Sequence, residues 1–270
     1  MEVSKRFLDR AKSNLRRYQK VLASAHSRDV NESDTSVIVS DFLADMLGYD
    51  KYSEVTTELA IKSTFCDLAI RVGGKIQFLI EVKSIGTDLR ENHLRQATDY
   101  AANQGIEWVL LTNGARWSAH RVRFEQPIQT EEVFSVDLLD EACGPKDVLG
   151  KLYLISKEAA STAAIEAYLR RKEATSRYVL AQLLLGEPTV KLLRRQLRQL
   201  FPGLKVSEGD LEELMRAEVL KRDALEGDRA AAAAKMVRRL TRRRERSKVD
   251  SISSSPAPSS SSGPTPTHAS

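Results

Sequence analysis

The sequence predicts an α/β fold in which a mixed sheet is covered by helices and is followed by a C-terminal helical extension. Three strand-like segments follow one another between residues 54 and 83, and a helical stretch separates them from a further buried strand. This order of helices, strands, helix and strand is typical of a mixed sheet with helical layers. From about residue 146 the chain becomes helical and charged, which indicates a second region.

The length and composition limit the class of protein. The chain has 270 residues, which is enough for one sizeable core and a second, smaller unit. No apolar run approaches the roughly 18 residues of a membrane span, and the charged start lacks the apolar core of a secretion signal. Cys66 and Cys143 do not make a disulfide framework, so we expect free thiols in the reducing environment of the cytoplasm. The net charge of +5 is a mild indication of a polyanionic partner.

The individual elements are predicted from periodicity and from the residues that end them. A helix with a basic face is expected within 1–27, and a second helix is expected from Thr35 to Leu47, with Asp34 as its cap. Gly48 and Gly105 are expected to end helices. The expected strands are 54–61, 65–72, 75–83, "EWVLLTNG", "WSAHRV" and "VFSVDL", with a helix near 88–104 between the third and fourth of them.

The apolar pattern of the segments 65–72 and 75–83 predicts how they pair. A three-residue loop, Gly73-Gly74-Lys75, pairs Val72 with Ile76, Ile70 with Phe78 and Leu68 with Ile80, so that apolar residues meet apolar residues. A slip of one residue turns a whole face of a strand over, so this pattern specifies the register strongly.

In this register Asp67 lies opposite Glu81, with Cβ atoms roughly 5 Å apart, and Lys83 follows on the same face. Two carboxylates at this distance repel each other unless something lies between them. Carboxylate oxygens suit Mg²⁺, with Mn²⁺ as a substitute, and the Lys83 ammonium can orient or deprotonate a water molecule or offset charge on a phosphate. The alternative interpretation is a solvated cluster of salt bridges. The spacing of these three residues is short and leaves both interpretations open.

The same residues carry a resemblance to a known family. The segments "NESDT", "CDLAI", "FLIEVKS", "RQATDYA" and "LLTNGARWSAHRV" resemble the PD-(D/E)xK nuclease superfamily. They are closer still to the N-terminal nuclease domain of type I restriction enzyme R subunits and its stand-alone relatives. The resemblance covers roughly residues 30–125, and it implies a restriction-endonuclease-like sheet. The proline that usually precedes the first aspartate of the motif is absent, and Cys66 stands in its place.

The resemblance implies roles for particular residues. Asp67 and Glu81 would be metal ligands and Lys83 the catalytic lysine, while Glu32 matches the early acidic position and would be a further ligand or a water-mediated contact. Gln96, with Tyr100 four residues later on one helix face, matches a motif that borders the active site. Taken alone, Gln96 reads as a surface residue and Tyr100 as core. Trp117 is expected in the core or at its rim rather than stacked on a base.

The chain also departs from the long R subunits. No G-x-x-x-x-G-K-[ST] loop is present, so we expect no ATP-driven motor in this sequence. The expected organisation is a nuclease-like domain over 1–145, a basic helical region over 146–248, where Asp210 is expected to cap a helix, and a disordered Ser/Pro tail over 249–270. Within the helical region Arg238, Arg239, Arg242 and Arg243 are candidates for contacts with nucleic-acid phosphates. A solvated helix face explains the same arginines equally well.

Two functions therefore remain open from the sequence. The first is a Mg²⁺-dependent DNA endonuclease in restriction or defence, acting as a homodimer or with other restriction-system subunits. The second is a catalytically inactive nucleic-acid-binding or scaffold protein on a nuclease fold. The presence of all three charged residues, Asp67, Glu81 and Lys83, favours the first. The recognition sequence, the choice between DNA and RNA and the oligomeric state do not follow from the sequence.

Overall fold

The computed structural model divides the chain into two compact units, Met1–Arg170 and Arg171–Ser270, which we call the sheet unit and the helical unit. The first unit continues beyond residue 145, where the sequence suggested a domain boundary, because helices after that residue pack against the sheet. The structure describes residues 3–61, 64–140, 142, 144–160 and 163–253, and it leaves out the side chains of 58–61, 64–65, 245 and 247–253.

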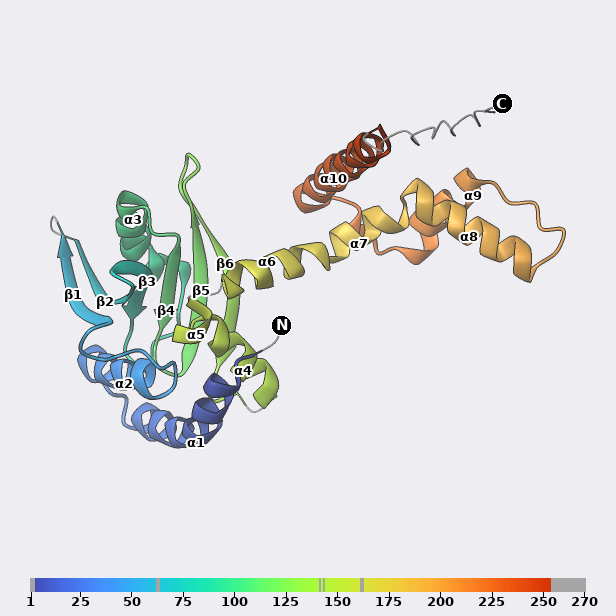
Figure 1. The fold of residues 1–270 in the computed structure, drawn as a ribbon. Helices are drawn as coiled ribbons and strands as arrows, with labels where there is room; N and C mark the ends of the chain where they lie inside the picture. Colours follow the sequence, from blue (N-terminus) through green and yellow to red (C-terminus); the bar gives the residue numbers. More distant parts are fainter. Residues whose placement is uncertain (1–2, 62–63, 141, 143, 161–162, 254–270) are drawn as a thin grey trace, which may run out of the picture. The chain divides into compact units, whose positions relative to one another are not determined.

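The sheet unit consists of helices, six strands and short connections (Figure 1). Its helices are α1 (Lys5–Ser27), α2 (Glu32–Asp45), η1 (Glu91–Leu94), α3 (Arg95–Gln104), α4 (Pro145–Leu154), α5 (Lys157–Ala160) and the start of α6 (Ala164–Ala174). Its strands are β1 (Val55–Ile61), β2 (Thr64–Val72), β3 (Lys75–Val82), β4 (Trp108–Thr112), β5 (Arg116–Arg123) and β6 (Gln129–Asp137). The predicted α/β class with a mixed sheet and C-terminal helices is confirmed.

The sheet has the strand order β1-β2-β3-β4-β5-β6. All neighbouring strands are antiparallel except β3 and β4, which run parallel. A parallel pair needs a crossover connection, and η1 with α3 provides it. The carboxyl ends of β3 and β4 therefore meet at one edge of the sheet, where residues that follow both strands come together.

Helices cover both faces of the sheet and form two apolar cores (Figure 1). The larger core lies under α1, α2 and α4, where α1 contributes apolar residues at helical spacing, from Phe7 through Tyr18 to Leu22. Trp117 belongs to this core, stacks on Phe42 and is 1% exposed, which confirms its predicted place. The smaller core lies under α3, which contributes Tyr100.

The β2–β3 hairpin confirms two of the three predicted pairs but corrects the predicted loop and the predicted pair of Val72 with Ile76. Leu68 pairs with Ile80 and Ile70 with Phe78, as expected. However, Val72 pairs with Lys75, so the turn contains only Gly73 and Gly74, which both have positive φ. A bulge between residues 70 and 71 of the ladder adds one residue on β3 and restores the register. The prediction of a three-residue loop was therefore wrong, because the pattern of faces cannot distinguish a longer loop from a bulge.

Two predicted helix caps were also wrong in a related way. Asn31 caps α2, with its side chain accepting from the backbone N–H of Asp34 at 2.8 Å, so the helix begins three residues earlier than expected. Ser207 caps the helix for which Asp210 was expected. The Asp210 carboxylate instead accepts from the Ser207 N–H in a capping box. In both cases the acidic residue predicted as the cap is the third residue of the helix.

The helical unit contains α7 (Arg177–Leu184), α8 (Glu187–Leu200), α9 (Glu208–Leu214), η2 (Met215–Val219), η3 (Arg222–Ala224) and α10 (Asp228–Ser253). Within this unit α10 contacts α7, and α8 contacts α9. Helix α10 includes residues 249–253 of the segment predicted as a Ser/Pro tail, and the rest of that segment lies outside the described residues. None of the helices in the described part of the chain combines the length and the apolar character that a membrane crossing requires.

Candidate active site

The carboxyl end of β3 brings three of the predicted site residues together. The β2–β3 ladder ends at Leu68 and Ile80, so Asp67 and Glu81 are the next residues in the same register. Asp67 turns its carboxylate toward β3, where Oδ2 accepts a hydrogen bond from the backbone N–H of Val82 at 2.7 Å. The Lys83 Nζ lies 2.8 Å from Glu81 Oε1. The predicted convergence of side chains 67, 81 and 83 is present in the structure.

Helix α2 adds a third carboxylate to this group. Glu32 is the first residue of α2, and its Oε2 lies 3.5 Å from Lys83 Nζ. Lys83 therefore contacts carboxylates from two elements that are far apart in the sequence, while its own backbone N–H donates to Thr112 O of β4 at 2.8 Å. We call Glu32, Asp67, Glu81 and Lys83 the acidic cluster. With every group ionised, three carboxylates and one ammonium give the acidic cluster a formal charge of −2.

Burial sets the electrostatics of the acidic cluster. The Glu81 side chain is 8% exposed and that of Lys83 is 19% exposed, whereas that of Glu32 is half exposed. Burial raises the pKa of Asp67 and of Glu81, although hydrogen bonds from Val82 and Lys83 oppose this rise. For Lys83, burial alone lowers the pKa, but the hydrogen bond to Glu81 and the surrounding carboxylates outweigh it and raise the pKa.

One oxygen of Glu81 has no hydrogen-bond partner. Oε2 is buried and accepts no hydrogen bond, while Oε1 contacts Lys83. A buried carboxylate oxygen without a donor is unusual, and it suits a hard cation, which binds oxygen ligands. Within the described residues no three His, Cys, Asp or Glu side chains converge closely enough to hold a metal ion by themselves. Two carboxylates suffice for Mg²⁺, because it usually keeps several waters and shares phosphate oxygens.

The two residues expected beside the site on α3 have different environments. Gln96 is exposed in the first turn of α3. Tyr100 is 3% exposed in the smaller core, and its hydroxyl is buried without a hydrogen-bond partner. Burial raises the pKa of Tyr100, with the Cys66 thiol as a further cause. Tyr100 is therefore a core residue, and the exposed position of Gln96 does not by itself assign it a role.

Sequence analysis missed the side chain that holds the loop after Lys83. Asn113 follows β4, and its Nδ2 donates to Ile85 O at 3.1 Å and to Thr87 O at 3.0 Å. Its Oδ1 accepts from the Arg116 N–H at 2.7 Å. Asn113 stands within the segment "EWVLLTNG", which was predicted as a strand, and the chain turns directly after it, since Gly114 has a φ of +84°. A single asparagine after a strand gives no local pattern that predicts its hydrogen bonds to the distant loop after β3.

A pocket of about 520 Å³ is lined by the segment that follows Lys83, although no residue of the acidic cluster lines it. The loop after Lys83 forms one wall, the residues after β4 form another, and α1 closes it with His26. Arg116 lines it as a cation, while Asp88 and Asp137 line it as anions. The loop that follows Lys83 therefore borders a concave surface with both polar and apolar lining residues.

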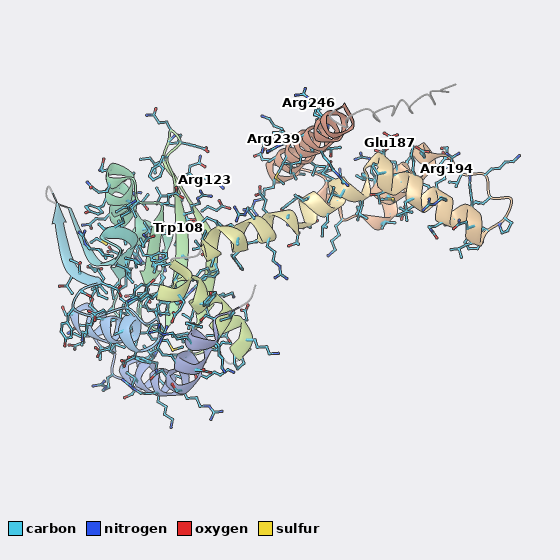
Figure 2. The ribbon with its side chains drawn as sticks, viewed as in Figure 1. Trp108, Arg123, Glu187, Arg194, Arg239 and Arg246 are labelled. Atoms are coloured by element: carbon cyan, nitrogen blue, oxygen red, sulfur yellow. The ribbon has the colours of Figure 1, made fainter. Side chains whose placement is uncertain are left out.

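The four arginines predicted to contact nucleic acid lie in the other unit. Arg238, Arg239, Arg242 and Arg243 are exposed on α10. Together with Lys235 and Arg246 they line an open groove of about 770 Å³ along that helix (Figure 2). The spacing of three and four residues places these cations on one helix face.

Comparison with known proteins matches part of the chain. Residues 38–134 match the family model described as "Type I restriction enzyme R protein N terminus". The matched region contains Asp67, Glu81, Lys83 and Gln96 but not Glu32, and it ends before the helical unit. The match supports a restriction-enzyme-like domain in this part of the chain and suggests a restriction-related nuclease. Searches of curated proteins and of solved structures found no match.

Proposed function

We propose that this protein is a Mg²⁺-dependent DNA endonuclease of the PD-(D/E)xK type with a role in restriction. The observation that carries the proposal is the acidic cluster at the carboxyl end of β3, where a buried Glu81 oxygen has no donor among the residues that the structure describes. The matched family model supports a restriction-related role. In this proposal Asp67 and Glu81 bind the metal ion, and Glu32 lies on the solvent-exposed side of the metal site.

The charge of the acidic cluster supports a divalent cation. The acidic cluster has a formal charge of −2 when every group is ionised, and burial opposes the ionised forms of Asp67 and Glu81. A bound Mg²⁺ supplies charge neutralisation and orients the scissile phosphate and a water molecule. Lys83 then places its ammonium beside the phosphate, where it stabilises the negative charge that grows in the transition state.

The rest of the protein positions these groups. The Lys83 backbone is fixed by Thr112, and Asn113 ties down the loop that follows it. Rigid support of this kind matters because catalytic geometry is sensitive to small displacements. The basic face of α10 contributes phosphate contacts that raise affinity for DNA without reading its sequence.

Plasmid cleavage tests this proposal. Wild-type protein is expected to nick or cut plasmid DNA with Mg²⁺ or Mn²⁺ and to stop when a chelator is added. Asp67→Asn and Lys83→Met are expected to abolish cutting, while Lys75→Met, which changes an exposed lysine at the other end of β3, retains it. Cutting that survives both site substitutions would contradict the proposal. DNA binding without any cutting by the wild type would favour the inactive binding protein instead.

A further inference from the structure

Exposed apolar side chains are concentrated in the helical unit. Both apolar cores of the described residues lie in the sheet unit, whereas the helices of the second unit leave large apolar side chains open to solvent. A group of exposed apolar residues on one region of a protein marks an interaction surface. These residues are Leu180, Leu183, Leu184, Leu192, Leu193, Leu200, Phe201, Leu204, Leu214, Val219 and Leu240.

The longest part of this surface is built by α8, α9 and the residues that join them. Arg194 holds the two helices together, with Nη1 3.0 Å from Glu208 Oε1 and Nε 3.1 Å from Val206 O. Figure 2 shows Glu187 and Arg194 on α8. We define the α8–α9 surface by the exposed apolar residues of this pair and of η2, which are Leu192, Leu193, Leu200, Phe201, Leu204, Leu214 and Val219.

Charges of opposite sign accompany this surface. Arg195 and Arg198 are exposed on α8, and Glu213 and Glu218 are exposed on α9 and η2. No ion pair joins any of these four side chains to another described residue. The unit therefore presents a basic helix and an acidic helix side by side, each with unpaired charge. Such a surface is complementary to itself, because a two-fold axis places the basic helix of one copy against the acidic helix of the other.

We propose that the α8–α9 surface binds the same surface of a second copy of this chain. In the described part of the sheet unit, by contrast, the exposed large apolar residues are scattered over four separate elements and turns. These are Val21, Val37, Tyr52, Phe124 and Ile128. Self-association satisfies both the apolar residues and the unpaired charges, and it does not depend on the proposed nuclease activity.

The mass of the full chain in solution tests the proposal directly. Light scattering after gel filtration is expected to give twice the 30.2 kDa of one chain for the wild type. Phe201→Asp is expected to raise the dissociation constant of the dimer at least about tenfold, because it places a charge within an apolar interface. Val37→Asp is the matched control, since Val37 and Phe201 are both 59% exposed, and it retains the dimer. A monomeric wild type, or a Phe201→Asp variant that dimerises like the control, would overturn the proposal.

A charge exchange tests the orientation of the two copies. Arg195→Glu/Arg198→Glu and Glu213→Arg/Glu218→Arg are each expected to be monomeric, because like charges then face each other across the axis. An equimolar mixture of the two variants is expected to form a heterodimer, because one variant is acidic on both helices and the other is basic on both, so opposite charges face each other at both contacts of α8 with α9. Both double variants change only exposed residues, and circular dichroism checks that each remains helical. A mixture that stays monomeric while the wild type is dimeric would refute the proposed pairing of α8 with α9.

Discussion

Replacing Lys83 with Met tests how the acidic cluster is held together without metal. The substitution keeps a long apolar side chain but removes the ammonium that contacts Glu81 Oε1 at 2.8 Å. Glu81 is only 8% exposed and its Oε2 already lacks a donor, so both carboxylate oxygens would be left without a hydrogen bond. Breaking a buried ion pair in this way costs about 3–5 kcal/mol. Because Lys83 remains 19% exposed, we expect about 3 kcal/mol, at the lower end of that range.

Urea unfolding in the presence of a chelator measures this loss. Both tryptophans of the chain, Trp108 and Trp117, lie on β4 and β5, so their fluorescence reports the sheet unit alone. The double variant Lys83→Met/Glu81→Leu removes the stranded carboxylate as well, and we expect it to unfold within about 1 kcal/mol of the wild type. A single variant as stable as the wild type, or a double variant no more stable than the single one, would refute the reasoning.

Three further predictions concern other parts of the molecule. Burial lowers the pKa of His120 to about 4, so His120 binds a proton in the unfolded chain at a higher pH than in the folded protein. The free energy of unfolding should therefore drop by about 2 kcal/mol between pH 7 and pH 5 on account of this residue. Urea titrations at both pH values should show that His120→Gln lacks this part of the drop. Asn113→Ala should lower the free energy of unfolding by about 2–3 kcal/mol, because carbonyl oxygens of the loop after β3 lose their donor. An unchanged urea midpoint would show that the hydrogen bonds from Asn113 do not stabilise this loop. Arg239→Gln/Arg242→Gln should reduce the magnitude of the slope of log affinity against log salt concentration for DNA binding by about 2. An unchanged slope would show that these arginines of α10 do not contact DNA phosphates.

Local patterns predicted the elements of this fold well. The alternation of apolar residues placed β2 and β3, and the pairs Leu68 with Ile80 and Ile70 with Phe78 followed from matching their faces. The same alternation could not reveal the bulge. A three-residue loop, or a two-residue turn with one extra residue on β3, gives the same pairs of Ile70 with Phe78 and of Leu68 with Ile80. Helix starts were displaced because Asn31 and Ser207 compete as caps with acidic residues three positions later, and both residue types fit the same motif.

The candidate site was predictable only where strand register determines it. Asp67 and Glu81 follow from the hairpin, and Lys83 follows from the strand period. The contact between Glu32 and Lys83 joins residues 51 positions apart, and the tie from Asn113 to the loop after β3 depends on the parallel pairing of β3 with β4. Neither has a local signal, because each depends on how α2 and β4 pack against the end of β3. The family resemblance suggested Glu32 but did not suggest Asn113.

Calorimetric titration of Mn²⁺ into the metal-free protein tests the central claim most directly, namely that the acidic cluster at the end of β3 holds a hard cation. We predict that the wild type and Glu131→Gln, which changes an exposed carboxylate on β6, bind Mn²⁺ with equal affinity, and that Glu81→Gln binds none. Absence of binding by the wild type, or equal binding by Glu81→Gln, would contradict the claim.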